Sequence, residues 1–240
     1  TGSVYKASQL GMNRDVALRL IDAKLAEDQA YAKRFLAEAR AAARVSHENL
    51  CTIIEVGQDR GLYFAATELV DGQPLENMLQ QSGRITVEAA TDYLRQALKG
   101  LQAAYDLGIV HENIKPSNIL VDEMTGDLKI ADLGVPRNAA TPSAQTQLGE
   151  ASAPYYMAPE LGQGLRGDTR ADIYSLGATF YHLLAGEPVF NGPHATAVLM
   201  KHAGEEVVSL DTLALGIPPK LSSVIDRMLA KKPEDRYEEP

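Results

Sequence analysis

The sequence predicts an α+β protein in which a small part built from short strands precedes a larger, mainly helical part. Short β-prone runs fall within the first 70 positions. Farther along the chain, apolar residues recur at helical spacing over longer stretches. The turn-forming sequence Asp71-Gly72-Gln73-Pro74 separates the two patterns. A chain of 240 residues is long enough for one large domain or for two lobes that share a cleft.

The small part is predicted to contain strands and one helix. Residues 16–20 (VALRL) are β-prone, and residues 49–55 and 62–70 are predicted as two strands separated by a turn at 58–61. Residues 30–45 have the periodicity of a helix with one apolar face. The positions that define this face are Phe35, Ala39 and Ala42.

The larger part is predicted to be dominated by two long helices. Thr86 is suited to cap a helix that runs to about Leu107 and stops at Gly108. Residues 171–185 are apolar nearly all round, which predicts a helix buried at the centre of this part. Residues 138–153 are rich in Ala, Ser, Thr and Gln, which predicts a mobile surface loop. The apolar face of the first helix is expected to consist of Leu94, Leu98, Leu101 and Tyr105.

Composition narrows the classes of function. The net charge of −9 and the pI near 5.1 argue against nucleic acid and anionic membranes as partners, because both favour Lys/Arg patches. No apolar run is long enough to cross a bilayer, and the five histidines lack zinc-ligand spacing. The lone cysteine, Cys51, suits a reducing compartment and is interpreted as a small buried residue in a strand. Because the chain begins at Thr1, we interpret it as a piece of a longer protein, cytoplasmic or the cytoplasmic domain of a membrane-anchored one.

The strongest signal is the stretch at residues 111–120, HENIKPSNIL. It resembles the catalytic loop of protein kinases, whose pattern is H-R-D-L-x-x-x-N. Asp132-Leu133-Gly134 is similar to the family's D-F-G, and Ala158-Pro159-Glu160 is its A-P-E. Residues 16–19 (VALR) resemble V-A-I-K, and Glu38 follows 19 residues after Arg19, as the family's paired glutamate does.

The resemblance covers essentially the whole chain in order. It implies a single two-lobed kinase-like domain over residues 1–240, truncated at both ends, with a style closer to bacterial Ser/Thr kinases than to tyrosine kinases. A small antiparallel sheet lobe with one helix would span about 1–70, a hinge about 68–74, and a larger helical lobe about 75–240. Asp172 would open the buried helix, and Arg236 would form a buried structural ion pair with Glu160.

The resemblance also implies a nucleotide cleft and a catalytic centre. ATP with Mg²⁺ would be the ligand, since phosphoryl transfer needs positioned phosphates and bound metal. Asp132 and Asn118 would hold Mg²⁺ through hard oxygen ligands. Lys115 would face the transferring phosphate. The catalytic positions are thus Asn113, Lys115, Asn118 and Asp132. The nucleotide-binding positions are Gly2, Val4, Ala17, Arg19, Glu38, Thr67, Glu68, Val70 and Leu120.

Two departures from the family pattern concern groups that act in the reaction. Asn113 replaces the catalytic aspartate, and an amide offers no base near neutral pH. General-base help is typically worth about 10²–10⁴-fold in rate. Arg19 replaces the lysine, and its planar guanidinium is not equivalent to an ammonium. It could hold Glu38 bidentately and still touch phosphate, or it could fill the space that the phosphates need.

Two further departures concern control and the loop before A-P-E. Glu112 replaces an arginine that binds an activation-loop phosphate in many kinases, and a carboxylate would repel that phosphate. Phosphorylation is therefore not expected to switch the domain on by that route, and we interpret the hydroxyl residues nearby as linker residues. Ala153 lacks the hydroxyl that would contact the catalytic aspartate and Lys115. The hydroxyl residues concerned are Thr141, Ser143 and Thr146.

Three hypotheses follow. The first is a pseudokinase that binds ATP weakly, transfers phosphate poorly or not at all, and acts as a scaffold or switch for a protein signalling partner. The second is a low-activity Ser/Thr kinase in which Asn113 orients the substrate hydroxyl. The third is a nucleotide-free docking module in which Arg19 plugs the cleft.

Overall fold

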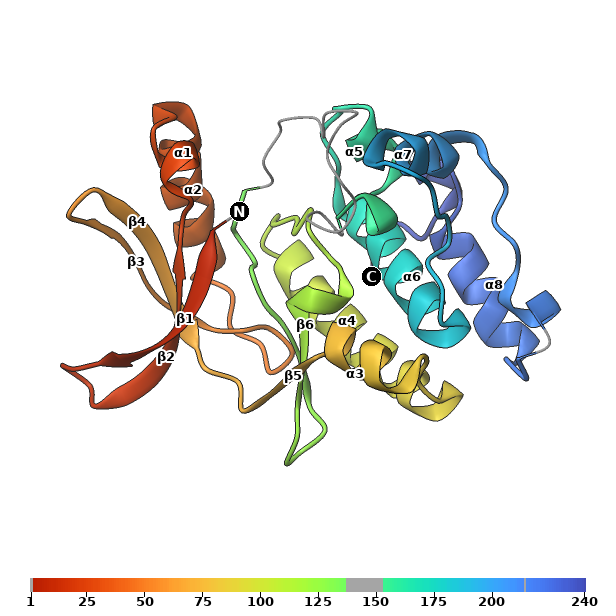
Figure 1. Ribbon diagram of the computed structural model, residues 1–240, viewed down its shortest axis with the longest axis horizontal. Helices are drawn as coiled ribbons and strands as arrows, with labels where there is room; N and C mark the ends of the chain where they lie inside the picture. The colour runs from red at the N-terminus through yellow and green to blue at the C-terminus, as the bar shows by residue number, and fades with distance from the viewer. Residues whose placement is uncertain (1, 137–152, 214) are drawn as a thin grey trace.

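A four-stranded antiparallel sheet and one long helix form the first part of the chain in the computed structural model, which describes residues 2–136, 153–213 and 215–240. The sheet has the order β1-β2-β4-β3 and lies to one side of the helical part (Figure 1). A short helix, α1, precedes the long helix α2. The elements are β1 (Ser3–Gln9), β2 (Arg14–Leu20), α1 (Ala23–Ala26), α2 (Gln29–Ala42), β3 (Ile53–Asp59) and β4 (Leu62–Glu68).

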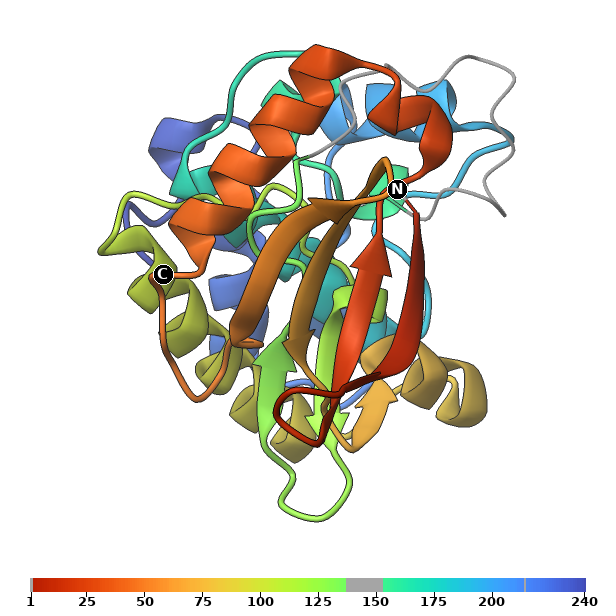
Figure 2. The same ribbon diagram turned by 90° about the vertical axis from the view of Figure 1, so that its left-hand side faces the viewer.

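Helix α2 forms where its sequence supplies both a cap and an apolar face. The Asp28 carboxylate accepts hydrogen bonds from the backbone N–H groups of Ala30 and Tyr31, which satisfies free donors of the first turn. Phe35 and Ala39 are wholly buried in a cluster with residues of β4 and the segment after β7. Figure 2 faces this lobe and shows α2 alongside the four strands. The predicted apolar face of the helix is thus confirmed.

The second part is mainly helical but begins with a small sheet. Strands β5, β6 and β7 pair in that order, all antiparallel. The strands are β5 (Gly72–Pro74), β6 (Ile119–Asp122) and β7 (Leu128–Ile130). The α-helices are α3 (Leu75–Ser82), α4 (Val87–Tyr105), α5 (Pro159–Gly162), α6 (Thr169–Ala185), α7 (Ala195–Gly204) and α8 (Pro219–Met228). Short 3₁₀ helices are η1 (Pro116–Asn118), η3 (Ala153–Tyr156), η4 (Leu210–Leu213) and η5 (Pro233–Asp235).

Helix α6 forms the centre of this lobe, as its all-round apolar sequence predicts. Fourteen of its residues are buried, including Tyr174 and Phe180. The helix ends at Gly186, which adopts the left-handed conformation. Helix α4 begins at the predicted cap, where the Thr86 hydroxyl accepts from the backbone N–H of Ala89. The α+β fold with a small sheet lobe and a helical lobe is confirmed.

Some element boundaries differ from those predicted. The strand expected at 49–55 starts at Ile53, so Cys51 is buried as predicted but precedes β3. Burial also raises the pKa of the Cys51 thiol to about 12, which keeps it protonated. Tyr105, predicted on the apolar face of α4, is exposed at the last turn of the helix. β1 was not predicted as a strand. Residues 138–152 of the predicted surface loop, with its three hydroxyl residues, lie outside the described residues.

No helix within the described ranges is long and apolar enough to cross a membrane.

A buried lysine near the end of the chain leads to a prediction about stability and pH. Lys231 Nζ has no hydrogen-bond partner in the described part and lies 4.4 Å from the centroid of the Phe190 ring. Burial lowers the pKa of Lys231 from 10.5 to about 8, because it penalises the charged form. Between these two pKa values the unfolded chain binds more protons than the folded chain, so folding becomes more favourable as pH rises from about 8 to about 10.5.

Replacing this side chain with Met is expected to stabilise the domain near pH 7. Met keeps an apolar stem beside Phe190 and removes the desolvated charge, and we expect a gain of about 1–2 kcal/mol after allowance for partial exposure. The measurement is urea unfolding of wild type and Lys231→Met at pH 7 and pH 10. The gain should shrink at the higher pH. A gain that is independent of pH would contradict the assignment to this ammonium.

Candidate active site

A cavity of about 310 Å³ lies where the four-stranded sheet meets the hinge segment and the residues around η1 and Asp132. Most of the predicted nucleotide-binding and metal-binding residues line it, although they come from distant parts of the sequence. A concave, largely apolar cavity with a few polar groups is the usual form of a small-molecule site. The predicted residues that line it are Val4, Ala17, Arg19, Thr67, Glu68, Val70, Asn118, Leu120 and Asp132.

A buried carboxylate of α6 holds the backbone of the loop that resembles a kinase catalytic loop. Asp172 accepts hydrogen bonds from the backbone N–H groups of His111 and Glu112, each at 2.7 Å. Burial raises the pKa of Asp172 to about 6, and the two backbone donors oppose that rise. Glu112 has a φ of +58°, a left-handed conformation that costs a non-glycine residue of order 1–3 kcal/mol and persists only where the surrounding structure imposes it. Glu112, which replaces the family's positively charged arginine, therefore lies at a constrained backbone position.

His111 and Asn118 complete the frame of the loop. His111 is buried, its Nδ1 accepts from the backbone N–H of Asn113, and its Nε2 is 2.8 Å from the carbonyl oxygen of Ala131. These partners fit the tautomer that donates from Nε2 and accepts at Nδ1. The side-chain Nδ2 of Asn118 donates to the backbone carbonyl oxygen of Asn113 at 2.9 Å. The backbone carbonyl oxygen of Asn118 accepts from the backbone N–H of Ala131 at 2.8 Å. The loop and the segment before Asp132 are therefore cross-linked by hydrogen bonds.

The cavity does not include Asn113 and Lys115 in its lining. Both lie on the loop beside it, where the carbonyl oxygen of Lys115 accepts from the backbone N–H of Asn118. Burial lowers the pKa of the Lys115 ammonium, while the charge of Asp132 acts in the opposite direction. Lys115 is thus a cation within the electrostatic reach of Asp132.

The most distinctive contact of the site joins Arg19 to Asp132. Arg19 Nε lies 2.7 Å from one carboxylate oxygen of Asp132, and its terminal NH2 nitrogen lies 2.5 Å from the other. The side chains are only 15% and 14% exposed, so the pair is well shielded. Asp132 has a φ of +67°, a conformation that Asp tolerates better than most residues. Each oxygen of the predicted metal ligand therefore already accepts a hydrogen bond.

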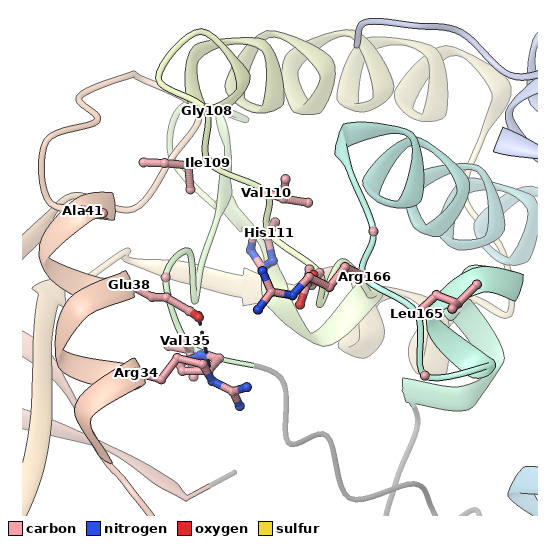
Figure 3. Close-up of a pocket in the computed structure, with 15 residues that line it drawn as sticks. Arg34, Glu38, Ala41, Gly108, Ile109, Val110, His111, Val135, Leu165 and Arg166 are labelled. Carbon is pink, nitrogen blue, oxygen red and sulfur yellow. Dashed lines mark ion pairs between the residues drawn. The ribbon is translucent and has the colours of Figure 1, made fainter. Parts of the chain in front are cut away.

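Glu38 is not the partner of Arg19, which corrects one of the two arrangements considered for this arginine. Its carboxylate lies 3.8 Å from Arg34 Nε on the same helix, and its side chain is 45% exposed. Figure 3 shows Glu38 pointing toward Arg34 in a second pocket, which Arg166 lines from the segment between α5 and α6. Burial raises the pKa of Glu38, and the nearby Glu112 adds to that rise. Glu38 therefore lines a different pocket from the cavity that Arg19 and Asp132 line.

Gly2 also lies outside the cavity lining. It has a φ of +109° and packs against the end of β2, where a Cβ atom would come within 1.9 Å of the carbonyl oxygen of Leu20. Only glycine fits a position with both that conformation and that contact. Ala153 begins η3 and is partly buried, with a methyl group in place of a hydroxyl.

The hinge leaves backbone groups available to a planar ligand. The Glu68 carboxylate turns away from such a role, since it accepts from the backbone N–H of Thr52 at 2.7 Å and from Lys129 Nζ at 3.0 Å. Leu69 and Val70 take part in no backbone hydrogen bond within the described segments. An adenine edge needs such free N–H and C=O groups.

Several lining residues were not predicted. They include Pro74 of β5, Ser117 of η1, and Leu133 and Val135 around Gly134. Their neighbours in the sequence had been predicted as site residues from the kinase motifs. Closeness to those motifs was therefore the signal that could have identified these residues. Cys51 precedes β3 and Ala65 lies in β4, and neither belongs to a kinase motif. They line the cavity because the sheet folds over it.

Comparisons with known proteins identify the family of the chain. The sequence pattern of the protein kinase domain matches residues 1–238. The chain belongs to the protein kinase family. Members generally use ATP with Mg²⁺. A crystal structure of a cysteine-to-alanine mutant of the PknI kinase domain of Mycobacterium tuberculosis is similar with a TM-score of 0.79 and 25% identity. The match covers 99% of this chain and 86% of that one.

Bacterial serine/threonine-protein kinases are among the similar curated proteins. PknL of Mycobacterium tuberculosis is 34% identical over 240 residues, and a probable serine/threonine-protein kinase of Clostridium acetobutylicum is 33% identical over 238 residues. Each match covers 99% of this chain. The chain spans 59% of the length of the first relative and 36% of the second. It is thus similar to the kinase portions of longer proteins.

Proposed function

We propose that this Ser/Thr protein kinase domain is a pseudokinase, which binds an adenine nucleotide in the cavity and transfers its phosphate poorly or not at all. The contact between Arg19 and Asp132 carries the proposal. In active kinases the corresponding aspartate holds Mg²⁺ on the transferring phosphate. Here both of its oxygens accept hydrogen bonds from a guanidinium of the chain.

The loss of the base supports the same proposal. Asn113 supplies an amide where a carboxylate would accept the proton of the substrate hydroxyl, and Ala153 supplies no hydroxyl to the loop. The groups that survive, Lys115 and Asn118, bind and position but do not remove a proton. Such a domain would act as a scaffold or switch toward a protein partner, and we propose a cytoplasmic setting for it.

The nucleotide-free docking module is the weaker alternative. Arg19 does not fill the cavity, because its guanidinium lies on Asp132 and about 310 Å³ of space remains. The low-activity kinase is compatible with the retained Asn118, Lys115 and Asp132. In the low-activity kinase Asn113 orients the substrate hydroxyl well enough for phosphate transfer, and in the pseudokinase it does not. Measuring the rate of phosphate transfer decides between them.

Nucleotide binding is tested by thermal unfolding in the presence of increasing ATP concentrations. Binding to the folded state adds RT ln(1 + [L]/Kd), about 2.7 kcal/mol at a ligand concentration of 100 Kd, so we expect a clear rise in melting temperature. Val70→Pro, which removes a hinge N–H, should weaken the rise. A melting temperature that ATP does not move, with or without Mg²⁺, would leave only the docking module.

A further inference from the structure

The cation that balances Asp132 comes from the chain itself. Arg19 lies on β2 opposite Ala65 of β4, within a regular antiparallel ladder. From there its side chain reaches Asp132, 113 residues later, with two parallel N–H to oxygen contacts. Bidentate guanidinium–carboxylate pairs are among the strongest charged contacts in proteins, and their planar geometry is specific to arginine.

A divalent cation finds little negative charge left around this carboxylate. Two carboxylates line the cavity, and the second, Glu68, is paired with Lys129. Asn118 and Asn113 are neutral amides, and Lys115 adds a further positive charge nearby.

The arrangement therefore does not fit Mg²⁺. This ion requires near-octahedral oxygen ligation and usually takes one or two carboxylates from the protein. To bind at Asp132, Mg²⁺ would have to displace a shielded guanidinium that already holds both carboxylate oxygens.

Arg19 also has donors left for an anion. Its hydrogen bonds to Asp132 use Nε and one terminal nitrogen. The other terminal nitrogen, Nη1, takes part in no hydrogen bond among the described residues, and Arg19 lines the cavity. A guanidinium with free N–H groups is suited to bind phosphate oxygens.

We propose that the cavity binds purine nucleotide without a divalent metal, with Arg19 as the permanent counter-ion of Asp132 and as the phosphate ligand. This inference rests on the proposed nucleotide binding. It specifies that the bound species is the nucleotide anion without a divalent metal ion. Chelation of ATP by Mg²⁺ should not tighten binding, because the metal shields the phosphate charge that Arg19 attracts.

Calorimetric titration of the domain with ATP, in Mg²⁺ and in EDTA, tests the proposal. Wild type should bind ATP in EDTA at least as tightly as in Mg²⁺, and Mg²⁺ or Mn²⁺ alone should not move its melting temperature. Arg19→Lys should release Asp132 and create a metal requirement, with binding about tenfold or more weaker in EDTA. Arg14→Lys is the matched control, because Arg14 lies on the same strand, is exposed, and hydrogen-bonds among the described residues to Gln9. It should behave as wild type.

The outcomes separate the two proposals. Wild-type binding that requires Mg²⁺ overturns metal independence and leaves the proposed nucleotide binding intact. Absence of binding in both solutions overturns both. If Arg19→Lys does not fold, as judged by its melting curve, the wild-type comparison between Mg²⁺ and EDTA still decides the question, since it needs no variant.

Discussion

The double variant Arg19→Lys/Asn113→Asp is expected to phosphorylate a generic protein substrate at least about 100-fold faster than wild type. If wild type shows no activity, the comparison is with the detection limit of the assay. A general base alone is typically worth about 10²–10⁴-fold in rate. Each change restores one lost element. Lysine presents a point charge that cannot hold both oxygens of Asp132 in a planar fork, so Asp132 becomes available to Mg²⁺. Aspartate at 113 supplies the missing base.

The single variant Asn113→Asp distinguishes the pseudokinase from a slow kinase. While Arg19 holds Asp132, a new base has no correctly positioned metal–phosphate group on which to act, so we expect a gain of less than about tenfold. Single-turnover assays with radiolabelled ATP and Mg²⁺ measure both rates, and melting curves confirm that each variant is folded. A 100-fold gain from Asn113→Asp alone would support the low-activity kinase and contradict our proposal.

Much of the fold follows from patterns that act locally. Helix α6 is apolar on all sides because it is surrounded, and α4 starts at Thr86 because that hydroxyl satisfies a free backbone donor. The spacing of the kinase motifs fixes which segments meet at the cleft. For this reason nine of the predicted residues line one cavity although they span residues 4 to 132.

The partner of Arg19 could not be predicted from the sequence, because two carboxylates are candidates to pair with this arginine. Glu38 follows by 19 positions and Asp132 by 113, and only the placement of α2 decides between them. Gly134 shows how close that helix comes, since a Cβ atom there would lie 2.6 Å from the Cβ of Ala42 and 2.8 Å from the carbonyl oxygen of Glu38. Even with this close packing, the Glu38 side chain turns toward Arg34 rather than Arg19.

The predicted ion pair between Arg236 and Glu160 is confirmed, and removing its cation is expected to cost about 3–5 kcal/mol of folding free energy. Arg236 is fully buried, and the hydrogen bonds of its guanidinium are directed to five oxygens. Two are the carboxylate oxygens of Glu160, at 2.7 and 2.9 Å, and three are backbone carbonyl oxygens. The carbonyls belong to Arg170, Ala230 and Lys231.

Arg236→Met would leave the Glu160 carboxylate, only 12% exposed, without its cation, and urea unfolding measures the loss. Arg95→Met is the matched control, because Arg95 pairs with Asp92 on the surface of α4 and should contribute less than about 1 kcal/mol. A loss below 1 kcal/mol for Arg236→Met would refute the prediction.

The double variant Arg236→Met/Glu160→Met separates the pair from its surroundings. It leaves no unpaired carboxylate and should recover part of the loss, because replacing both members of a buried pair with apolar groups is far less costly than removing one. The three backbone carbonyls would remain without their donor, so recovery should be incomplete. The pair ties the segment after α8 to α5 and includes none of the residues that line the cavity at Asp132. These losses should therefore appear in stability and leave the proposed nucleotide binding unchanged.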